Sequence, residues 1–316
     1  MSGVAVSVII TTLNSGQIFE KCLASVREND TRYNYEIIVV DAGSNDGTIN
    51  TAKRYADKVI VKNGCPPGEG RNLGVSHAQG DIVCFTDSDC LVPPNWIGLL
   101  IDNRLRLNNK DDKIVGVGGG NIPLMENLSP VELAISKVMR SPLVSFGARN
   151  VAVYKNERQV LHNPPMNSAY FRWVLEEVGG FGERGGYAED LELDGKIGNR
   201  GYKLYYLTAP LVYHKHKSSL EKFAAQMHDF GIKRVRANRE YPKISRFYHY
   251  GPLLLYLMLF TPPFFIPLAM ALANSCYVCL RERSSVLFRP IFRLTLSFHK
   301  NYGAGELKAL LHRGGK

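Results

Sequence analysis

The sequence predicts an α/β fold: an open, mostly parallel sheet with helices on both faces, followed by a helical, membrane-associated segment at the C-terminal end. Three observations support this prediction. Short runs rich in β-branched residues alternate with helix-like stretches through the first half of the chain, which is typical of a parallel sheet with crossover helices. These runs are apolar throughout, as strands buried on both faces are. The last third combines a basic excess with a long stretch free of charged side chains.

The elements of the predicted sheet follow one another in regular order. The predicted strands are "VAVSVIITT" (4–12), "YEIIVVDAG" (35–43), "KVIVK" (58–62), "DIVCFTD" (81–87) and "KIVGVGGG" (113–120). The predicted helices between them span 17–29, 47–56, 69–78 and 95–107. Asp46 is the expected N-cap of the second helix, because an Asp side chain can accept hydrogen bonds from the free N–H groups of a first turn.

Polar side chains follow three of these strands. They are Thr11, Thr12 and Asn14 after the first strand, Asp41 with "GSNDGT" after the second, and Asp87 and Asp89 after the fourth. Ligands of open parallel sheets bind at the carboxyl ends of the strands, so the three ends are expected to converge on a nucleotide-sized site. Asn, Asp and Gly also form ordinary strand-to-helix turns, and that interpretation is preferred for Asp46 and Thr48.

The stretch "VCFTDSDC" runs an apolar strand into two carboxylates, Asp87 and Asp89. A D-x-D sequence is common in proteins. Here its position at the end of a strand is what makes it a candidate metal site. Two carboxylates there can hold a hard divalent cation such as Mg2+ or Mn2+. Such an ion stabilises the negative charge left on a diphosphate when its bond to a sugar breaks.

A second pair of carboxylates, Glu189 and Asp190, begins a predicted helix that continues through Leu191, Leu193 and Ile197. Simple helix capping is one explanation, because negative charge at a helix N-terminus is stabilised by the macrodipole. Alternatively, the preceding Gly-rich loop orients the pair toward a substrate. Residues 121–166, upstream, have poor periodicity and many prolines, which indicates a long irregular segment near the site.

Charge and cysteine usage exclude some classes of protein. The net charge of +10 lies wholly in the last third, since residues 1–213 carry −2 and residues 214–316 carry +12. This basic, apolar region favours an anionic membrane surface over nucleic acid, for which no recognition motif is present. Six scattered cysteines form no disulfide framework and indicate a reducing compartment. The N-terminal run resembles a strand rather than a signal peptide, so the cytoplasmic face of the cell membrane is the expected location.

Residues 247–280 contain no Lys, Arg, Asp or Glu and are long enough to enter a bilayer. Pro262, Pro263 and Pro267 interrupt this stretch. Basic clusters flank it on both sides and prefer the cytoplasm, so a hairpin is favoured over a single span, with a buried pair of soluble helices third. Residues 218–237 form an amphipathic helix that lies on a membrane or packs on the protein.

Five motifs, in order and spacing, resemble those of the inverting family 2 glycosyltransferases. They are "SVIITTLN", "EIIVVDAGSNDGT", "GEGRNLGVSHAQGDIVCFTDSD", "EEVGGFGE" and "YAEDLEL". The catalytic domain of that family has the A-type nucleotide-diphospho-sugar transferase fold, which is Rossmann-like. The resemblance covers about residues 4–216.

The resemblance implies roles for individual residues on the donor side. Thr12 and Asn14 line the nucleotide pocket, and Asp41 contacts the base. Arg71, in "GRN", lies near the donor. In the family pattern "VVDDGS" the second acid is replaced here by Ala42, so no role passes to that position.

It also implies a metal site and a catalytic base. Asp89 is the principal metal ligand, and Asp87 faces the ribose and sugar beside the ion. Asp190, next to Glu189, is the catalytic base. His214, in "VYHKH", approaches the metal or the diphosphate, or is structural. The "QxxRW" signature of processive synthases is absent, so one sugar per visit is expected.

The predicted function follows from this chemistry. A UDP- or GDP-sugar donates one sugar in a single inverting displacement that depends on Mg2+ or Mn2+. A sugar hydroxyl acceptor needs a base, whereas a polyprenyl phosphate is already ionised, so the acidic pair favours a hydroxyl. The membrane segment indicates a lipid-linked saccharide acceptor, as in cell-envelope glycan biosynthesis or protein glycosylation. A polyprenyl- or dolichyl-phosphate glycosyl synthase is the alternative enzyme, and a nucleotide-sugar-binding membrane scaffold the non-enzymatic one.

The predicted division of the chain has four parts. They are a catalytic domain (1–216), a basic amphipathic linker (217–250), a hydrophobic hairpin or span (251–280) and a basic tail (281–316).

Overall fold

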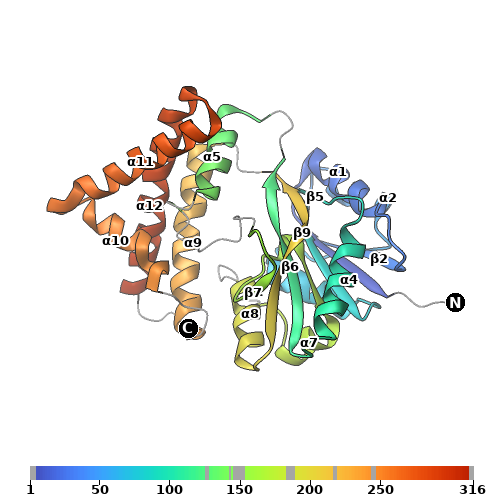
Figure 1. The fold of residues 1–316 in the computed structure, drawn as a ribbon. Helices are drawn as coiled ribbons and strands as arrows, with labels where there is room; N and C mark the ends of the chain where they lie inside the picture. Colours follow the sequence, from blue (N-terminus) through green and yellow to red (C-terminus); the bar gives the residue numbers. More distant parts are fainter. Residues whose placement is uncertain are drawn as a thin grey trace. The chain divides into compact units, whose positions relative to one another are not determined.

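A computed structural model describes residues 5–124, 128–141, 144, 154–182, 189–215, 219–242 and 247–312. The chain forms two compact units, and Figure 1 labels many of their helices and strands. Unit 1 consists of Met1–Ile122 and Val153–Lys215, and unit 2 consists of Pro123–Ala152 and His216–Lys316. The range 1–216, predicted as catalytic domain, therefore includes one segment that clusters with unit 2.

Unit 1 is built on a single sheet. Its strands, within the described residues, are β1 (Val6–Thr12), β2 (Tyr35–Asp41), β3 (Lys58–Val61), β4 (Ile82–Asp87), β5 (Cys90–Leu91), β6 (Ile114–Pro123), β7 (Arg158–Val160), β8 (Ser168–Phe171) and β9 (Lys203–His214). Its α-helices there are α1 (Gly16–Arg27), α2 (Thr48–Tyr55), α3 (Pro67–Ser76), α4 (Trp96–Asn108), α7 (Arg172–Val178) and α8 (Glu189–Asn199). The five predicted strands and four predicted helices of the first half are all present, within a few residues of their expected ends.

The strand order is β3-β2-β1-β4-β8-β6-β9-β5, and β7 pairs with β9. Strands β3, β2, β1 and β4 are parallel, whereas β8 is antiparallel to both β4 and β6. Strands β4 and β6 thus run in the same direction, as their crossover through α4 requires. The α/β class is confirmed, but the sheet is mixed, because the short strand β8 inserts between two strands that the sequence pattern places side by side.

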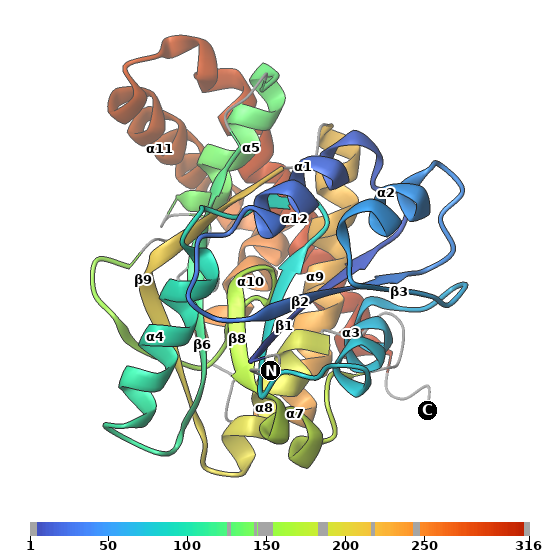
Figure 2. The same cartoon turned by 90° about the vertical axis from the view of Figure 1, so that its right-hand side faces the viewer.

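Helices cover both faces of this sheet, as predicted (Figure 2). Along β1, Val8 and Ile10 belong to a core with Phe19 of α1 and Trp96 of α4. Ile9 points the other way, as alternate residues of a strand do. It belongs to a second core, whose members include Val75 of α3, Leu175 of α7 and Leu193 and Ile197 of α8. Because both faces of β1 are buried, its carboxyl end is held in a fixed position.

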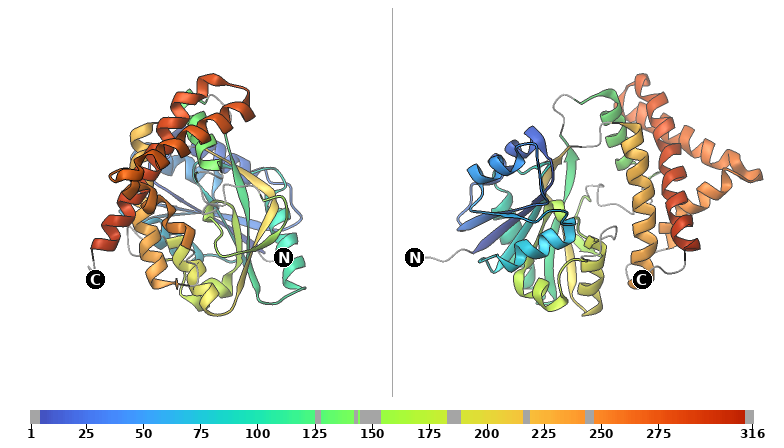
Figure 3. Two further views of the ribbon diagram at one scale, coloured as in Figure 1. Left: turned by 60° about the vertical axis from the view of Figure 1, so that its left-hand side comes forward. Right: turned by 180° about the vertical axis from the view of Figure 1, so that it is seen from behind.

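Unit 2 is helical in its described part. Its α-helices there are α5 (Pro130–Arg140), α9 (Leu220–Glu240), α10 (Gly251–Met258), α11 (Phe265–Glu282) and α12 (Phe288–Leu311). Helices α9 and α12 lie side by side (Figure 3), and a Cβ added at Gly305 would lie 2.1 Å from the carbonyl oxygen of His228. Phe223 and Met227 of α9 are buried in the core of unit 2. The amphipathic face of this helix therefore packs on the protein.

Two helices of unit 2 differ from the sequence prediction. Helix α5 lies inside the stretch expected to be irregular, and begins with a capping box between Ser129 and Glu132 and a proline in its first turn. Helix α12 occupies most of the range predicted as a basic tail. Beside its basic residues, this helix carries a buried apolar stripe at helical spacing, formed by Ile291, Leu294, Phe298 and Tyr302.

The uncharged stretch divides into α10 and α11, which meet at a short 3-10 turn, Pro262–Phe264. Among the described residues, one helix, Pro262–Glu282, is long and apolar enough to cross a membrane, and most of its residues are exposed. Phe260, Phe264 and Phe265, around the turn, are among the large exposed apolar side chains.

Candidate active site

The loops after β1, β2 and β4 meet at one edge of the sheet, as predicted. Thr12 Oγ1 lies 2.8 Å from Ser15 Oγ, which lies 2.8 Å from Ser88 Oγ in the D-S-D segment. The side-chain oxygen of Asn14 accepts a hydrogen bond from the backbone N–H of Asn45 (3.0 Å). Asn14 has a positive φ of 48°, which Asn tolerates better than most residues. The first-strand loop is thus fastened to both neighbouring loops.

Asp41 is fully buried at the end of β2. Its carboxylate accepts hydrogen bonds from the backbone N–H groups of Gly43 (2.8 Å) and Ser44 (2.7 Å) and from the Ser44 hydroxyl (2.6 Å). Gly43 has a φ of 98°, a conformation that favours glycine. In this structure Asp41 shapes the turn, and its contact with a nucleotide base stays a prediction.

Arg71 of α3 joins the end of β4 to the start of α8. Its guanidinium lies 3.1 Å from Asp87 Oδ1 and 3.1 Å from Glu189 Oε1. The guanidinium also lies over the ring of Phe181, with the Cζ atom of Arg71 5.4 Å from the ring centre. Burial raises the pKa of Asp87, as does the charge of Asp89, while Arg71 opposes both. Because the carboxylate of Glu189 is engaged in an ion pair with Arg71, Asp190 is the better candidate for a catalytic base.

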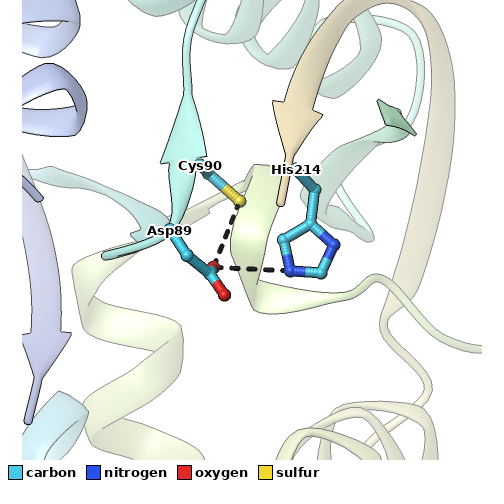
Figure 4. A group of neighbouring side chains, drawn as sticks. All are labelled: Asp89, Cys90 and His214. Atoms are coloured by element: carbon cyan, nitrogen blue, oxygen red, sulfur yellow. Dashed lines mark hydrogen bonds and ion pairs between the residues drawn. The ribbon is translucent and has the colours of Figure 1, made fainter. Parts of the chain in front are cut away.

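The described residues include a group that can hold a cation, formed by Asp89, Cys90 and His214, whose ligand atoms lie within 4.8 Å of one another. The antiparallel pairing of β5 and β9 sets Cys90 opposite His214. His214 Nε2 lies 3.4 Å from Asp89 Oδ1 (Figure 4). Asp89 and His214, far apart in sequence, are thus brought together, and their role as metal ligands stays a prediction.

The donor atoms of this group suit Mg2+ or Mn2+ in part. A carboxylate oxygen and an imidazole nitrogen are suitable ligands for Mn2+, and the carboxylate for either ion. Cys90 is fully buried. Burial, with the charges of Asp89 and Asp87, raises the pKa of its thiol well above the usual range. A sulfur ligand is also softer than the oxygen ligands that Mg2+ and Mn2+ prefer. Asp87 was also predicted as a metal ligand. Its Oδ1 forms an ion pair with Arg71, and Asp87 does not belong to the group.

Asp190 is partly exposed in the first turn of α8, and His162 lies beside it. His162 Nε2 is 3.6 Å from Asp190 Oδ2, and its Nδ1 is 2.8 Å from Asp194 Oδ2. Neither His162 nor Asp194 was predicted from sequence. The spacing of Asp190 and Asp194, four residues apart on a helix, is the one signal that places them on the same face. The Gly-rich loop expected to orient the acidic pair, residues 183–188, lies outside the described residues.

Comparisons with known proteins identify the family and the fold. The family model for glycosyl transferase family 2 matches residues 7–178. Among curated relatives, a dolichyl N-acetyl-α-D-glucosaminyl phosphate 3-β-D-2,3-diacetamido-2,3-dideoxy-β-D-glucuronosyltransferase of Methanococcus voltae is 24% identical over 97% of both chains. The O-antigen chain rhamnosyltransferase RfbN of Salmonella typhimurium is 26% identical over 72% of this chain and 71% of its own.

Solved structures show the same fold. The mannosyltransferase PcManGT of Pyrobaculum calidifontis, in complex with GDP-Man and Mn2+, aligns with a TM-score of 0.62 and 19% identity over 98% of this chain and 88% of its own. Residues 1–349 of Staphylococcus aureus TarS, in complex with UDP-GlcNAc, align with a TM-score of 0.52 and 17% identity over 97% and 92%. With the family model covering more than half of the chain, the protein belongs to glycosyl transferase family 2 and is a glycosyltransferase of the A-type fold.

Proposed function

We propose that this enzyme moves one sugar, with inversion, from a nucleotide-sugar donor to a hydroxyl group of a lipid-linked saccharide at the cytoplasmic face of the cell membrane. The observation that carries the proposal is the carboxylate of Asp190. It begins α8 beside Glu189, which Arg71 ties to the D-S-D strand end. A base is thereby held near the edge of the sheet where a donor is expected.

The donor side of the proposal assigns a UDP- or GDP-sugar to the converging loops. Thr12 and Asn14 lie in the first-strand loop, and Arg71 and Asp87 form the adjacent buried ion pair. Structural neighbours carry GDP-Man and UDP-GlcNAc, which supports a donor of this class without selecting between the two bases. Asp89 and His214 would hold Mg2+ or Mn2+, which when bound neutralises charge on the leaving diphosphate.

The acceptor side rests on the need for a base. A sugar hydroxyl must lose its proton as it attacks, and a positioned carboxylate contributes about 10²–10⁴-fold to such a step. The Methanococcus voltae relative is named for transfer to a dolichyl-linked sugar phosphate, and it matches nearly the full length of this chain. This likeness supports a lipid-linked saccharide over a bare polyprenyl phosphate.

The membrane part of the proposal rests on α10 and α11. Their stretch has no Lys, Arg, Asp or Glu, and aromatic side chains at the turn between them are exposed. Helix α10 has eight residues and is too short to span a bilayer. We therefore propose that α10 and α11 enter the membrane as a hairpin, with the basic flanks on the cytoplasmic side.

The proposal is tested with full-length protein in detergent. A thermal-shift panel of nucleoside diphosphates with Mn2+ identifies the donor class, and release of nucleoside diphosphate from the matching sugar donors then measures turnover. Asp89→Ala is expected to remove the effect of Mn2+, and full activity of this variant would refute the metal assignment.

Asp190→Asn separates the two acceptor classes. With a polyprenyl-linked N-acetylglucosamine as acceptor, kcat is expected to fall by about 10²–10⁴-fold. Turnover near the wild-type level, or transfer to polyprenyl phosphate alone, would favour the phosphate glycosyl synthase.

A further inference from the structure

His162 lies between two carboxylates of the same helix. Asp190 and Asp194 are one turn apart on α8, and His162 follows β7 and faces both. Its Nδ1 is 2.8 Å from Asp194 Oδ2 and its Nε2 is 3.6 Å from Asp190 Oδ2. The three side chains form a row, Asp190–His162–Asp194, that leads from the partly exposed base into the protein.

The inner end of this row is fixed. Asp194 is only 2% exposed. Its carboxylate accepts hydrogen bonds from the backbone N–H of Asn163 (2.9 Å) and the hydroxyl of Tyr170 (3.3 Å), in addition to His162. Burial raises the pKa of Asp194, and the hydrogen bond from His162 opposes that rise. Because three donors point at it, Asp194 is stabilised as a carboxylate, as a buried charge must be.

This arrangement selects one form of the imidazole. With Asp194 accepting from Nδ1–H, the neutral ring carries its hydrogen on Nδ1 and its lone pair on Nε2. That lone pair is on the nitrogen that lies nearer Asp190. A neutral imidazole is more basic than an ordinary aspartate by roughly 2 to 3 pK units. A proton on Asp190 can therefore move downhill to His162.

We propose that His162, held by Asp194, is a positioning residue that orients Asp190 and takes over the proton that Asp190 removes from the acceptor. This inference rests on the proposed function, specifically on a hydroxyl acceptor. The acceptor O–H bond breaks as its oxygen bonds to the anomeric carbon, and the bond from that carbon to the diphosphate breaks with its electron pair leaving on the diphosphate. The proton passes to Asp190 Oδ2. It moves on to Nε2 when the 3.6 Å separation of these two atoms shortens to hydrogen-bond distance or one water bridges it, and the imidazolium then releases it to solvent.

The pH dependence follows from the groups around His162. The described charged or titratable groups that face the row are Asp190 and Asp194 of α8 and Tyr170 of β8, and Arg71 of α3 acts on Asp190 through its charge. At pH values where the imidazole of His162 is already protonated, it accepts no further proton. Turnover is therefore expected to decline on the acid side through the titration of a histidine rather than of a carboxylate alone.

The test compares wild type, His162→Gln and Asp194→Asn in full-length protein, with GDP-mannose and UDP-N-acetylglucosamine as donors and polyprenyl-linked N-acetylglucosamine as acceptor. His162→Gln is expected to lower kcat by about 10- to 100-fold, to leave KM for the donor within about twofold, and to move the acid limb of the pH profile toward the carboxylate range. Asp194→Asn is expected to lower kcat in the same direction. His77→Gln, on the exposed end of α3, is the matched control and is expected to change nothing.

A second measurement does not depend on turnover. In ¹⁵N-histidine NMR of the full chain, His162 is expected to show the Nδ1–H tautomer, and Asp190→Asn is expected to move its titration midpoint to lower pH, because a neighbouring negative charge is lost. An unchanged acid limb in His162→Gln, or a His162 titration indifferent to Asp190→Asn, overturns the inference. Wild-type protein that transfers from neither donor speaks against the proposed function instead, and the NMR titration still decides the role of His162.

Discussion

Units 1 and 2 both bury an arginine near carboxyl groups, but they treat the charges differently. In unit 1, Arg71 forms ion pairs with Asp87 and Glu189, each at 3.1 Å. In unit 2, Arg234 of α9 and the fully buried Glu306 of α12 make no ion pair, although both residues are described, and burial raises the pKa of Glu306 to about 8. At the candidate site the charges are thus kept and compensated, whereas burial between the packed helices favours the neutral form of Glu306. Unit 1 also buries Arg104, whose guanidinium has no hydrogen-bond partner among the described residues.

The comparison predicts that the charges around Arg71 govern both activity and stability, whereas Arg234 and Glu306 affect stability and its dependence on pH alone. Buried charges that lose a partner are costly, while a buried carboxyl that is protonated costs much less. Substitutions in the two units therefore have different expected signatures in unfolding and in turnover.

The largest effect is expected from Arg71→Met, which leaves two carboxylates without their shared partner. Breaking a buried pair in this way costs about 3–5 kcal/mol of unfolding free energy, and donor turnover is expected to be lost as the strand end and α8 separate. Urea unfolding and nucleoside diphosphate release measure the two effects. Arg54→Met is the control, because its ion pair with Glu20 is exposed, and such pairs contribute about 1 kcal/mol or less. Equal stability of the two variants would contradict the prediction.

The next effect concerns Glu306 and pH. Its pKa is about 8 in the folded protein and near 4.3 in an unfolded chain, so between these values the folded state holds more protons. Stability therefore falls as pH rises through this window. Glu306→Gln is expected to remove that fall, which is on the order of 3 kcal/mol between pH 5 and pH 8.

Urea unfolding in detergent at several pH values measures this dependence. Glu240→Gln, at the exposed end of α9, is the control and should keep the wild-type slope. A wild-type protein whose stability is constant from pH 5 to pH 8 would show that Glu306 is not the buried neutral acid described above.

A smaller effect is expected from the close contact of α9 and α12. A Cβ added at Gly305 would meet the backbone of His228 at 2.1 Å, so Gly305→Val must push the helices apart. Overpacking of this kind costs about 1–3 kcal/mol. At Gly198, near the end of α8, an added Cβ meets nothing within 4 Å, and Gly198→Ala should instead stabilise the protein by about 0.5–1 kcal/mol. Thermal unfolding distinguishes the two signs.

The elements of the two units also differ in how well they can be predicted from the sequence. The parallel strands β1 to β4 were predicted because each has its own apolar run and a following helix. Strand β8 was not, because four residues, "SAYF", carry too little pattern. Helix α12 was not predicted because its segment is rich in basic residues, although its buried apolar residues have helical spacing.

The site shows a similar division. Asp89 and His214 were found through their motifs, and the structure brings them within 3.4 Å. His162 could not be found this way, because its relation to Asp190 and Asp194 depends on where the chain after β7 is folded back. Short-range patterns predict strand ends, and they placed the N-cap of α2 one residue early, at Asp46 instead of Gly47. A contact across about 30 residues without a motif requires the fold.

The smallest effect concerns the exposed apolar side chains of the two units. Phe264, at the turn between α10 and α11, is 53% exposed, and Trp173 of unit 1 is 46% exposed. If the hairpin enters a membrane, Phe264→Ser should weaken binding to vesicles that contain anionic lipid by about 1–2 kcal/mol, or roughly 5- to 30-fold. Trp173→Ser should leave vesicle binding unchanged, because that surface belongs to the catalytic unit. Co-sedimentation at fixed ionic strength measures both variants, and donor hydrolysis in detergent should be the same for Phe264→Ser and wild type. Equal loss of vesicle binding in the two variants would mean that exposure alone, rather than the hairpin, determines membrane association.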